Sequence, residues 1–389
     1  MAIPFVYNLR NVMQRPVSTL TTATGIALTV AVLLAALALA GGFRSTMQSA
    51  GSPDKALILS SGADSEVMSG FSRNAGDILR SNPGVATGPD GRSQATLEMV
   101  ATTNLQRVGQ RGSSNIRVRG IDLATVGVRT NFKIAEGRMF TPGTGEVIVG
   151  KGIATRFANC SVGSEFKVQR RLLKVVGLFD TGGSSYESEV WGDQNVLMPL
   201  FHRDGGYQVA LVRMKDPSQF AAFKKELESD PRLGVNVKRE DLYYAEQSQG
   251  VAVMVTVLGG FITLVMAVGA LFGAANTMFA AVSGRTREIA TLLVLGFSPL
   301  AIMASFVVES MITAVIGGAL GCLLALPING ITTSTTNFQS FSEVAFQFRV
   351  TPQLMLVALV FSAVLGAFGG FFPALKAARQ PIALTRGGG

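Results

Sequence analysis

One stretch of the sequence approaches a nucleotide-binding motif. Residues 145–152 read Gly-Glu-Val-Ile-Val-Gly-Lys-Gly, which is close to a phosphate-binding loop that ends in Gly-Lys-Ser or Gly-Lys-Thr. The last residue here is Gly152, so the hydroxyl that would reach magnesium is missing. Residues 147–149 are also typical of a strand rather than of a flexible loop. We therefore expect no nucleotide to bind at this stretch.

A second stretch contains residue types that hydrolases use. Ser184 and Ser185 lie near Glu187 and Glu189, and the single histidine, His202, follows at a distance. Neither serine lies in a nucleophile-elbow motif, and no spacing fixes a nucleophile beside a base. One histidine and two cysteines also give no metal-site spacing. We interpret the stretch as a polar loop and expect no catalytic, cofactor or metal site in the chain.

Glu309 is the only ionisable residue well inside a long apolar stretch. A carboxylate inside a membrane is costly and is functional by default, and two roles compete for it. A proton or ion carrier would need charged residues on neighbouring spans, which the sequence does not offer. A packing role would pair Glu309 with an amide or hydroxyl of an adjacent helix, such as Asn276 or Thr277. We favour the packing role.

A charged segment separates two apolar stretches. Residues 283–298 read Ser-Gly-Arg-Thr-Arg-Glu-Ile-Ala-Thr-Leu-Leu-Val-Leu-Gly-Phe-Ser. On a helix the apolar residues share one side, Arg285 and Glu288 lie on another, and Gly296 ends the helix. The pattern predicts a short helix beneath the membrane whose charged side faces the cytosol and docks another protein. The alternative is an ordinary amphipathic re-entry helix.

The composition indicates which elements hold these residues. The 389 residues are 48% apolar and only 15% charged, with 44 glycines, against roughly one-quarter charged residues in a soluble domain. Of the 25 acidic residues, 22 lie between Phe43 and Gly250, so a polar insert interrupts an apolar protein. The net charge of +9 is not gathered with aromatic residues on one face. We therefore expect no nucleic-acid partner.

Four stretches reach the roughly 20 apolar residues that cross a bilayer. They are residues 17–42, 250–283, 298–328 and 350–375. Basic clusters flank them, and the positive-inside rule places three segments in the cytosol. These are the lead 1–16, the coupling segment 284–297 and the tail 376–389. The insert 43–249 and the loop 329–349 then face outward.

Local features of the apolar segments refine this topology. Ala38–Ala40 resembles a signal-peptidase site, but the apolar run exceeds the roughly 7–15 residues of a secretory signal, so we expect a retained helix. The apolar residues of the lead share one helix face, namely Phe5, Leu9, Val12 and Met13. The lead is therefore expected to be an amphipathic helix on the inner leaflet, with a disordered tail as the alternative. Glycines spaced four apart mark candidate helix contacts, at Gly269 and Gly273, Gly317 and Gly321, and Gly366 and Gly370.

The outward insert is interpreted as two subdomains. Residues 43–103 and 208–249 each contain a strand, a helix and a second strand, which predicts a split βαβ subdomain and a stalk. Residues 104–207 are expected to be β-rich, with strand runs that include Glu146–Val149 and Val196–Met198. The stalk is expected to be rigid, with a tether hinged at Gly41, Gly42 and Gly250 as the alternative. The fold class is thus an α+β membrane protein, with four transmembrane helices and a large extracytoplasmic domain between the first and second.

Several of these segments resemble the permeases of MacB/FtsX/LolC type, the membrane subunits of type VII ABC transporters. Residues 285–297 are similar to their coupling-helix signature. Residues 372–384, Phe-Pro-Ala-Leu-Lys-Ala-Ala-Arg-Gln-Pro-Ile-Ala-Leu, are similar to their closing motif. Residues 9–30 resemble their first helix, and weaker landmarks of the periplasmic domain occur at 136–140, 146–150 and 175–179. The resemblance extends over nearly the whole chain.

The resemblance implies a dimeric permease that binds cytosolic ATPase subunits and passes their motion to the periplasmic domains. It assigns ATPase coupling to Arg285, Thr286, Arg287, Glu288, Leu292, Leu295 and Gly296. It also marks Pro373, Ala377, Arg379 and Pro381 in the closing motif. Only 16 residues precede the first span, so the ATPase, with its ATP and magnesium, is expected on a separate polypeptide. This chain itself would be a non-catalytic subunit.

The expected function is that of the permease in an ATP-driven mechanotransmission machine of a bacterial inner membrane. It would export or extract an amphipathic lipid, lipoprotein, peptide or drug from the periplasmic side. Its partners would be the ATPase and a second permease copy, in a homodimer rather than a heterodimer, with a periplasmic adaptor and an outer-membrane channel as further candidates. The alternative is an FtsX-like regulator of a periplasmic cell-wall hydrolase. A secondary transporter is disfavoured by the lack of membrane-embedded charges and of a repeated helix bundle.

Overall fold

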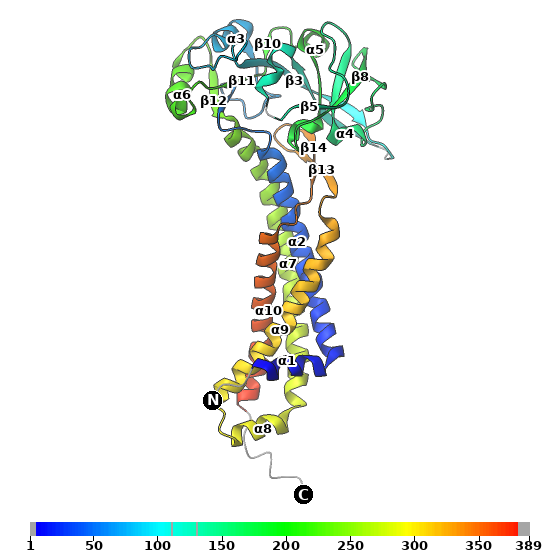
Figure 1. Ribbon diagram of the computed structural model, residues 1–389, viewed down its shortest axis with the longest axis vertical. Helices are drawn as coiled ribbons and strands as arrows, with labels where there is room; N and C mark the ends of the chain where they lie inside the picture. Colours follow the sequence, from blue (N-terminus) through cyan, green and yellow to red (C-terminus); the bar gives the residue numbers. More distant parts are fainter. Residues whose placement is uncertain (1–4, 110–111, 130, 380–389) are drawn as a thin grey trace. The chain divides into compact units, whose positions relative to one another are not determined.

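The structure, a computed structural model, describes residues 5–109, 112–129 and 131–379. The chain forms two compact units (Figure 1). The helical unit comprises Met1–Gly41, Val253–Ile331 and Phe348–Gly389, and the sheet unit comprises Gly42–Ala252 and Thr332–Gln347.

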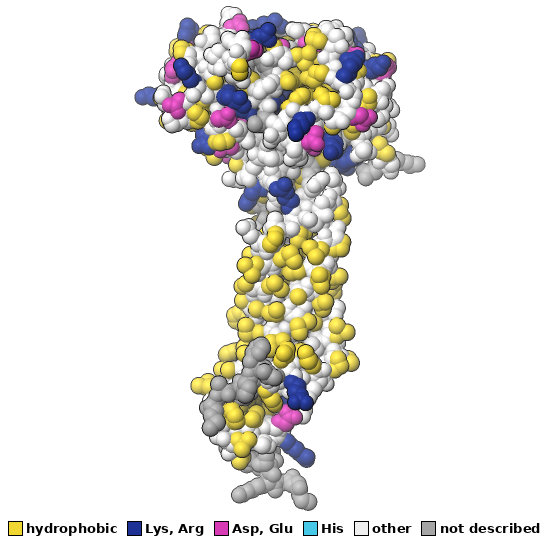
Figure 2. Space-filling model, viewed as in Figure 1, with side chains coloured by type: hydrophobic (Ala, Val, Ile, Leu, Met, Phe, Trp, Pro, Cys, Tyr) yellow, Lys and Arg dark blue, Asp and Glu magenta, His cyan; other side chains and the backbone are white. Residues whose placement is uncertain are grey.

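Long apolar helices dominate the helical unit. The helices with residues in it are α1 (Phe5–Gln14), α2 (Pro16–Gln48), α7 (Glu240–Ser283), α8 (Thr286–Val294), α9 (Pro299–Ala325), the 3-10 turn η4 (Leu326–Ile328) and α10 (Pro352–Ala378). Among the described residues, four are long and apolar enough to cross a membrane: α2, α7, α9 continued by η4, and α10. Hydrophobic side chains are spread along the visible face of the long helices (Figure 2). Ser298 and Thr351 cap α9 and α10 through their side-chain oxygens, and a proline follows each cap.

Glycines set how closely these helices pack. A Cβ at Gly317 or Gly321 of α9 would lie 2.6 Å from a carbonyl oxygen of α2. A Cβ at Gly366 or Gly370 of α10 would lie within 2.6 Å of side-chain atoms of α9. The third predicted pair, on α7, has no described neighbour within 4 Å. Two of the three glycine pairs are therefore at helix contacts within the chain, and the pair on α7 is not.

The sheet unit is built on one ten-stranded sheet in the order β12-β1-β11-β3-β4-β9-β6-β8-β5, with β7 paired to β8. The strands are β1 (Lys55–Ser60), β3 (Ala95–Gln106), β4 (Ser113–Ile121), β5 (Lys133–Gly137), β6 (Glu146–Gly150), β7 (Glu165–Val168), β8 (Arg171–Asp180), β9 (Glu189–Asp193), β11 (Val209–Arg213) and β12 (Val235–Arg239). The helices are α3 (Arg73–Arg80), α4 (Lys151–Ala154), α5 (Gln194–Leu200) and α6 (Phe220–Ser229), with the turns η1 (Leu123–Val128), η2 (Ser185–Ser188) and η3 (Pro217–Gln219). Two short ladders pair β2 (Phe71–Ser72) with β10 (Gly206–Tyr207), and β13 (Thr332–Asn337) with β14 (Ser342–Gln347).

The first half of the sheet has the split βαβ arrangement. Strand β1 is antiparallel to both β11 and β12, and β11 is antiparallel to β3. Consequently β1 runs parallel to β3, and β11 parallel to β12, with another strand between the members of each pair. Helices α3 and α6 make the two connections, and their apolar residues Leu79, Phe223 and Leu227 share a core with these strands.

The second half shares the same sheet but has its own core. Strands β4, β6, β8 and β9 contribute Val118, Val149, Val175 and Val190 to it. Strand β3 extends through both halves, so the predicted boundary between residues 103 and 104 falls inside a strand. The two predicted subdomains are therefore two cores on one sheet.

Two further segments differ from the sequence-based expectation. Val196–Met198 belongs to helix α5 rather than to a strand, because the Asp193 carboxylate accepts a hydrogen bond from Asn195 N and starts a helix there. The loop 329–349 contains the hairpin β13–β14, which belongs to the sheet unit. The predicted fold class is confirmed, since a split βαβ and a β-rich half lie between the first and second apolar helices.

Candidate functional site

The short helix α8 connects α7 to α9. It begins after Arg285 and ends before Gly296, whose positive φ of 91° suits a helix terminus. Ile289, on its apolar side, is 1% exposed and packs in a cluster with Phe306 of α9 and Ala377 of α10. The apolar side of α8 therefore faces the long helices, as the sequence pattern predicts.

Arg285 lies inside the helical unit rather than on the exposed side of the helix. Its side chain is 5% exposed, and its Nη1 donates a hydrogen bond to Glu309 Oε2 at 2.9 Å. Its Nε lies 4.0 Å from Glu288 Oε2. The expectation that Glu309 pairs with Asn276 or Thr277 is wrong, because the turn before α8 brings a guanidinium to the carboxylate, and a buried carboxylate is stabilised more by a cation than by an amide or hydroxyl. The expectation that Arg285 lies on the charged, exposed side is wrong for the same reason.

The exposed side of α8 combines charge with apolar area. Arg287 is exposed, and the Glu288 side chain is 61% exposed. One to two turns later, Val294 is 69% and Leu295 64% exposed, with Thr291 exposed between the two pairs. We call these five residues the α8 face. It is the part of α8 that can meet another protein.

Only some of the seven residues to which the resemblance assigns ATPase coupling lie on the α8 face. Arg287, Glu288 and Leu295 lie on it, and Gly296 is exposed just beyond it. Thr286 and Leu292 are half-buried at its edges. Sequence reasoning missed Thr291 and Val294, although spacings of four and seven residues from Arg287 would have placed both on its side of a helix.

The closing motif supports α8 from within the helical unit. Pro373 and Ala377 of α10 are buried, and Ala377 packs in the same cluster as Ile289. Arg379 is exposed at the C-terminal cap of α10. Pro381 lies outside the described residues.

The lead forms helix α1, which contacts α9 through its polar side. Asn8 is 3% exposed, and its Oδ1 accepts a hydrogen bond from Ser305 Oγ. Met13 is 72% and Leu9 38% exposed, whereas Val12 is 5% exposed. The lead is therefore helical, but Val12 turns inward with the asparagines instead of joining the predicted apolar face.

The sheet unit contains a buried cluster of balanced charge. Its six side chains are Arg117, Arg119, Arg129, Glu66, Glu98 and Glu189. The fully buried Arg119 donates to Glu66 at 2.9 Å, to Glu98 at 2.8 Å and to Glu189 at 2.7 Å. Burial alone would raise the pKa of Glu66, but Arg119 and Arg117 outweigh it and lower that pKa to about 2. Because three cations meet three anions, no buried charge is left unpaired.

This cluster holds the first turns of α7. The Tyr244 hydroxyl donates to Glu66 Oε1 at 3.2 Å, and the Tyr186 hydroxyl donates to Glu240 Oε1 at 3.1 Å. The two hydroxyls lie 2.8 Å apart. Lys55 Nζ lies 3.7 Å from Glu240 Oε2. The N-terminal end of α7 is thus tied to the sheet by polar groups that have little room to move.

The hairpin β13–β14 is held to the same sheet by a second buried carboxylate. The Glu343 side chain is 0% exposed and accepts hydrogen bonds from Arg107 and from Arg156, the latter at 2.6 Å. Ser188 Oγ accepts a hydrogen bond from Ala345 N at 2.8 Å. Burial would raise the pKa of Glu343, but hydrogen bonds and the two guanidinium groups lower it.

The two stretches considered for chemistry have structural roles. Residues 146–150 form strand β6, and Lys151 at the start of α4 pairs with Asp180 Oδ2 at 3.5 Å. Ser184 is buried and hydrogen-bonded to Thr181, and His202 is exposed. Across residues 5–109, 112–129 and 131–379, no group of three His, Cys, Asp or Glu side chains could hold a metal ion.

Comparison with known proteins gives two family matches that together extend over most of the chain. The family model of the MacB-like periplasmic core domain matches residues 19–230, more than half of the chain. The model of the FtsX-like permease C-terminal region matches residues 260–382. An uncharacterized ABC transporter permease of Methanocaldococcus jannaschii is 25% identical over 267 residues, 66% of each chain. The macrolide export ATP-binding/permease protein MacB of Pasteurella multocida is 25% identical over 360 residues, which are 84% of this chain and 54% of MacB.

The chain spans about half the length of this MacB relative. Among solved structures, the periplasmic region of MacB from Actinobacillus actinomycetemcomitans is 13% identical, with a TM-score of 0.38, over 52% of this chain and 96% of that one. The extracellular domain of the transporter YknZ from Gram-positive bacteria is 16% identical, with a TM-score of 0.35, over 47% and 99%. On the two family models, the chain belongs to the MacB-like and FtsX-like permease family and is a membrane protein with a MacB-like periplasmic domain.

Proposed function

We propose that this chain is the permease subunit of an ATP-driven ABC transporter that works by mechanotransmission in a bacterial inner membrane. The observation that carries the proposal is the geometry of α8. Ile289 and Arg285 fix it to the long helices, while the α8 face is exposed. A helix held on one side and open on the other passes the displacement of a docked partner to the helices behind it. An ATPase subunit docked on the α8 face would therefore move α7 and α9.

The ATP and magnesium would be bound by that ATPase subunit. In this chain the only near-match to a phosphate loop is strand β6, whose Gly150 has no room for a side chain because a Cβ there would lie 2.2 Å from Glu187 O. A buried strand cannot close around phosphates. We propose a cytosolic ABC ATPase and a second copy of the permease as the partners, and a periplasmic adaptor and outer-membrane channel as further ones.

Two connections inside the sheet unit are suited to receive this motion. The N-terminal turns of α7 are tied to the sheet through Tyr244 and Glu66. The hairpin that connects α9 to α10 is tied to it through Glu343. Movement of the long helices would thus reach the sheet unit at two points. The proposed result is export or extraction of an amphipathic lipid, lipoprotein, peptide or drug on the periplasmic side.

The FtsX-like match over residues 260–382 supports a second candidate function. In it, the same movement of α8 would activate a periplasmic cell-wall hydrolase, and nothing would be transported. The two candidates differ in what meets the sheet unit. A photo-crosslinking amino acid at the 65% exposed Met68 would capture an adaptor or cargo in the first case and a hydrolase or its activator in the second.

Photo-crosslinking from Leu295 tests the proposed docking of an ATPase subunit. In cells, a photo-crosslinker there is expected to form an adduct with an ABC ATPase subunit, identified by mass spectrometry of the joined peptides. The matched control is Leu320, which is 37% exposed within the apolar helix α9 and is expected to give no such adduct. Adducts at Leu295 that contain no ATPase, or equal ATPase adducts at both positions, would contradict the proposal.

A further inference from the structure

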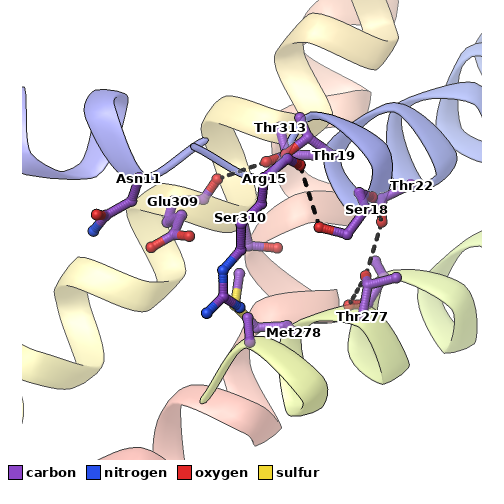
Figure 3. A pocket seen from close by; sticks show the side chains of 12 residues that line it. Asn11, Arg15, Ser18, Thr19, Thr22, Thr277, Met278, Glu309, Ser310 and Thr313 are labelled. Atoms are coloured by element: carbon purple, nitrogen blue, oxygen red, sulfur yellow. Dashed lines mark hydrogen bonds between the residues drawn. The ribbon is translucent and has the colours of Figure 1, made fainter. Parts of the chain in front are cut away.

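A polar cavity lies in the helical unit where α1 ends and α2 begins. The last turn of α1, the first turns of α2, the C-terminal turns of α7 and the middle of α9 line it (Figure 3). The side chains that matter are Asn11, Arg15, Ser18, Thr22, Thr277 and Glu309. The space open to the centre of a water-sized sphere is about 40 Å³, and one water needs about 10–15 Å³ by that measure. We call this space the Arg15 cavity.

Two side chains of the Arg15 cavity can donate hydrogen bonds that no described residue accepts. Asn11 is 6% exposed, and its Nδ2 is buried without an acceptor. Arg15 reaches into the space between Glu309 and Met278 (Figure 3). Arg15 is half-buried, and its positive charge acts on the Glu309 carboxylate. Its guanidinium makes no hydrogen bond to the described residues. The unpaired, buried Asn11 amide is costly, and it calls for an acceptor that the described residues do not supply.

Two features of the cavity favour an anion. Glu309 is already paired with Arg285 at 2.9 Å, and Arg285 also lies 4.0 Å from Glu288. Arg15 is the one cation among the described residues that line the cavity. Helix α2, which is 33 residues long, begins at Pro16 beside the cavity. The N-terminal turn of a helix carries unpaired N–H groups and a partial positive charge, which favour a phosphate or another oxyanion.

A groove next to the cavity indicates where this anion comes from. Arg15, Pro16, Val17, Ser18, Thr21 and Thr277 line it, and it shares three of these residues with the cavity. Val17 is 79% exposed and Leu20, on the same helix, 62%. In a span that crosses a bilayer, such side chains meet hydrocarbon. A ligand whose charged group reaches Arg15 can therefore lay an apolar chain against α2.

We propose that the Arg15 cavity binds the phosphate group of an anionic phospholipid. Arg15 pairs with the phosphate, Asn11 Nδ2 donates a further hydrogen bond, and an acyl chain lies along Val17 and Leu20. Inorganic phosphate has the same charged group, but only the lipid uses the apolar groove. This site is separate from the α8 face and does not rest on the proposed transport function.

Native mass spectrometry of the purified full chain tests the proposal. The chain is mixed with phosphatidylglycerol or phosphatidylcholine of identical acyl chains, and the lipids that stay bound are counted. Wild type is expected to retain phosphatidylglycerol preferentially. Arg15→Gln should lower its affinity about tenfold, the usual effect of losing a charge-assisted hydrogen bond. The matched control, Arg10→Gln, removes an exposed arginine of α1 and should keep wild-type retention.

Two further variants keep the test decisive if Arg15→Gln does not fold. Arg15→Lys retains the charge and should retain part of the binding, and Asn11→Ala should weaken it without changing charge. Equal retention of the two lipids by wild type, or equal loss in the Arg10 and Arg15 variants, would overturn the proposal. Phosphorus NMR of the chain in phosphatidylcholine nanodiscs distinguishes the sources. Arg15-dependent broadening of inorganic phosphate there, without preference for phosphatidylglycerol, would assign the site to a soluble anion and overturn the lipid.

Discussion

The buried contact between Arg285 and Glu309 has two consequences. It neutralises a carboxylate inside an apolar helix, and it fixes the first residue before α8 to α9. Both side chains are less than 10% exposed, and a buried pair contributes little net stability when intact but is costly to break. Its main effect is therefore positional, since it determines where α8 starts.

Exchanging the two charges tests this positional role. Arg285→Glu and Glu309→Arg each leave like charges facing one another in a buried site, and each is expected to destabilise the helical unit by about 3–5 kcal/mol. The double exchange should recover part of that loss, measured by denaturant unfolding in detergent. Crosslinking from Leu295 reports the orientation of α8. The yield of ATPase adducts should therefore fall in each single variant and recover in part in the double exchange. If the double variant is as unstable as the sum of the two single variants, the pair does not act as a unit.

Glu343 makes the attachment of the hairpin β13–β14 dependent on pH. Its pKa is lower in the folded protein than the ordinary 4.5, so its contribution is fully present above that value and is lost as the pH falls through the folded pKa. A spin label at the exposed Phe338, at the tip of the hairpin, should thus stay immobile from pH 7 to 5 and become mobile under stronger acid. The substitution Glu343→Gln should make the label at Phe338 more mobile already at pH 7.

A label at Leu172 serves as the control for the hairpin experiment. This residue is 59% exposed on strand β8, in the main sheet. The same unit contains Glu66, whose pKa of about 2 keeps it ionised to lower pH. Equal mobilisation of both labels would mean that the whole unit unfolds rather than that the hairpin detaches.

Single residues in the sequence indicated the type of role but not the partner. The apolar run around Glu309 predicted a structural carboxylate, because no charged residue lies on a neighbouring span. Arg285 is 24 residues away, beyond the reach of helical periodicity, and only the turn before α8 brings it close. The unpaired Asn11 likewise has no sequence signature, since its burial follows from how α1 contacts α9.

At the scale of elements, glycine content alone does not determine which helices touch. Gly321 of α9 lies against the backbone of α2, where a Cβ would be 2.6 Å from Ala27 O and 2.8 Å from Val30 Cβ. Backbone atoms cannot move aside as a flexible side chain does. Gly269 of α7 also has a second glycine four residues away, but it has no described neighbour within 4 Å.

Substituting these two glycines should therefore have opposite effects. Gly321→Ala is expected to force α9 away from α2 and to cost about 1–3 kcal/mol of stability. Gly269→Ala should be neutral or stabilising, because alanine has a higher helix propensity than glycine by about 1 kcal/mol. Thermal unfolding of the two variants in the same detergent measures the difference. Equal destabilisation would show that α7 is packed at Gly269 in the assembled protein.

In the sheet unit, the sequence predicted local elements but not the long-range pairing of strands. The pattern of strand, helix and strand in residues 43–103 and again in 208–249 correctly predicted a split βαβ. The continuous ten-stranded sheet was not predicted, because it depends on β3 pairing with the distant strand β11 as well as with its neighbour β4, and long-range contacts set the register with β11. Helix α5 was missed because its apolar run Val196–Met198 suits either a strand or a buried helix.

At the scale of the whole molecule, two helices contain residues of both units. Helix α2 is continuous from Pro16 to Gln48 and α7 from Glu240 to Ser283. Within the sheet unit, Gly51, just after α2, packs so closely on the start of α7 that a Cβ there would lie 2.6 Å from Asp241 Cα. The ends of the two helices are thus joined to each other as well as to the sheet. The rigid stalk stays our hypothesis, with the flexible tether as its alternative.

An insertion between Gly41 and Gly42 separates the two hypotheses. Four glycines there would interrupt α2 with a flexible segment, since glycine costs about 1 kcal/mol per residue in a helix. Four alanines are the matched control, because they keep the helix and add only slightly more than one turn of 3.6 residues. If α2 is a rigid stalk, the glycine variant should lose cellular function while the alanine variant keeps most of it. A flexible tether tolerates both insertions, because lengthening a loop by a few residues costs little. Full function of the glycine variant, at wild-type abundance in the membrane, would therefore rule out the stalk and remove the mechanical link that the proposed function requires.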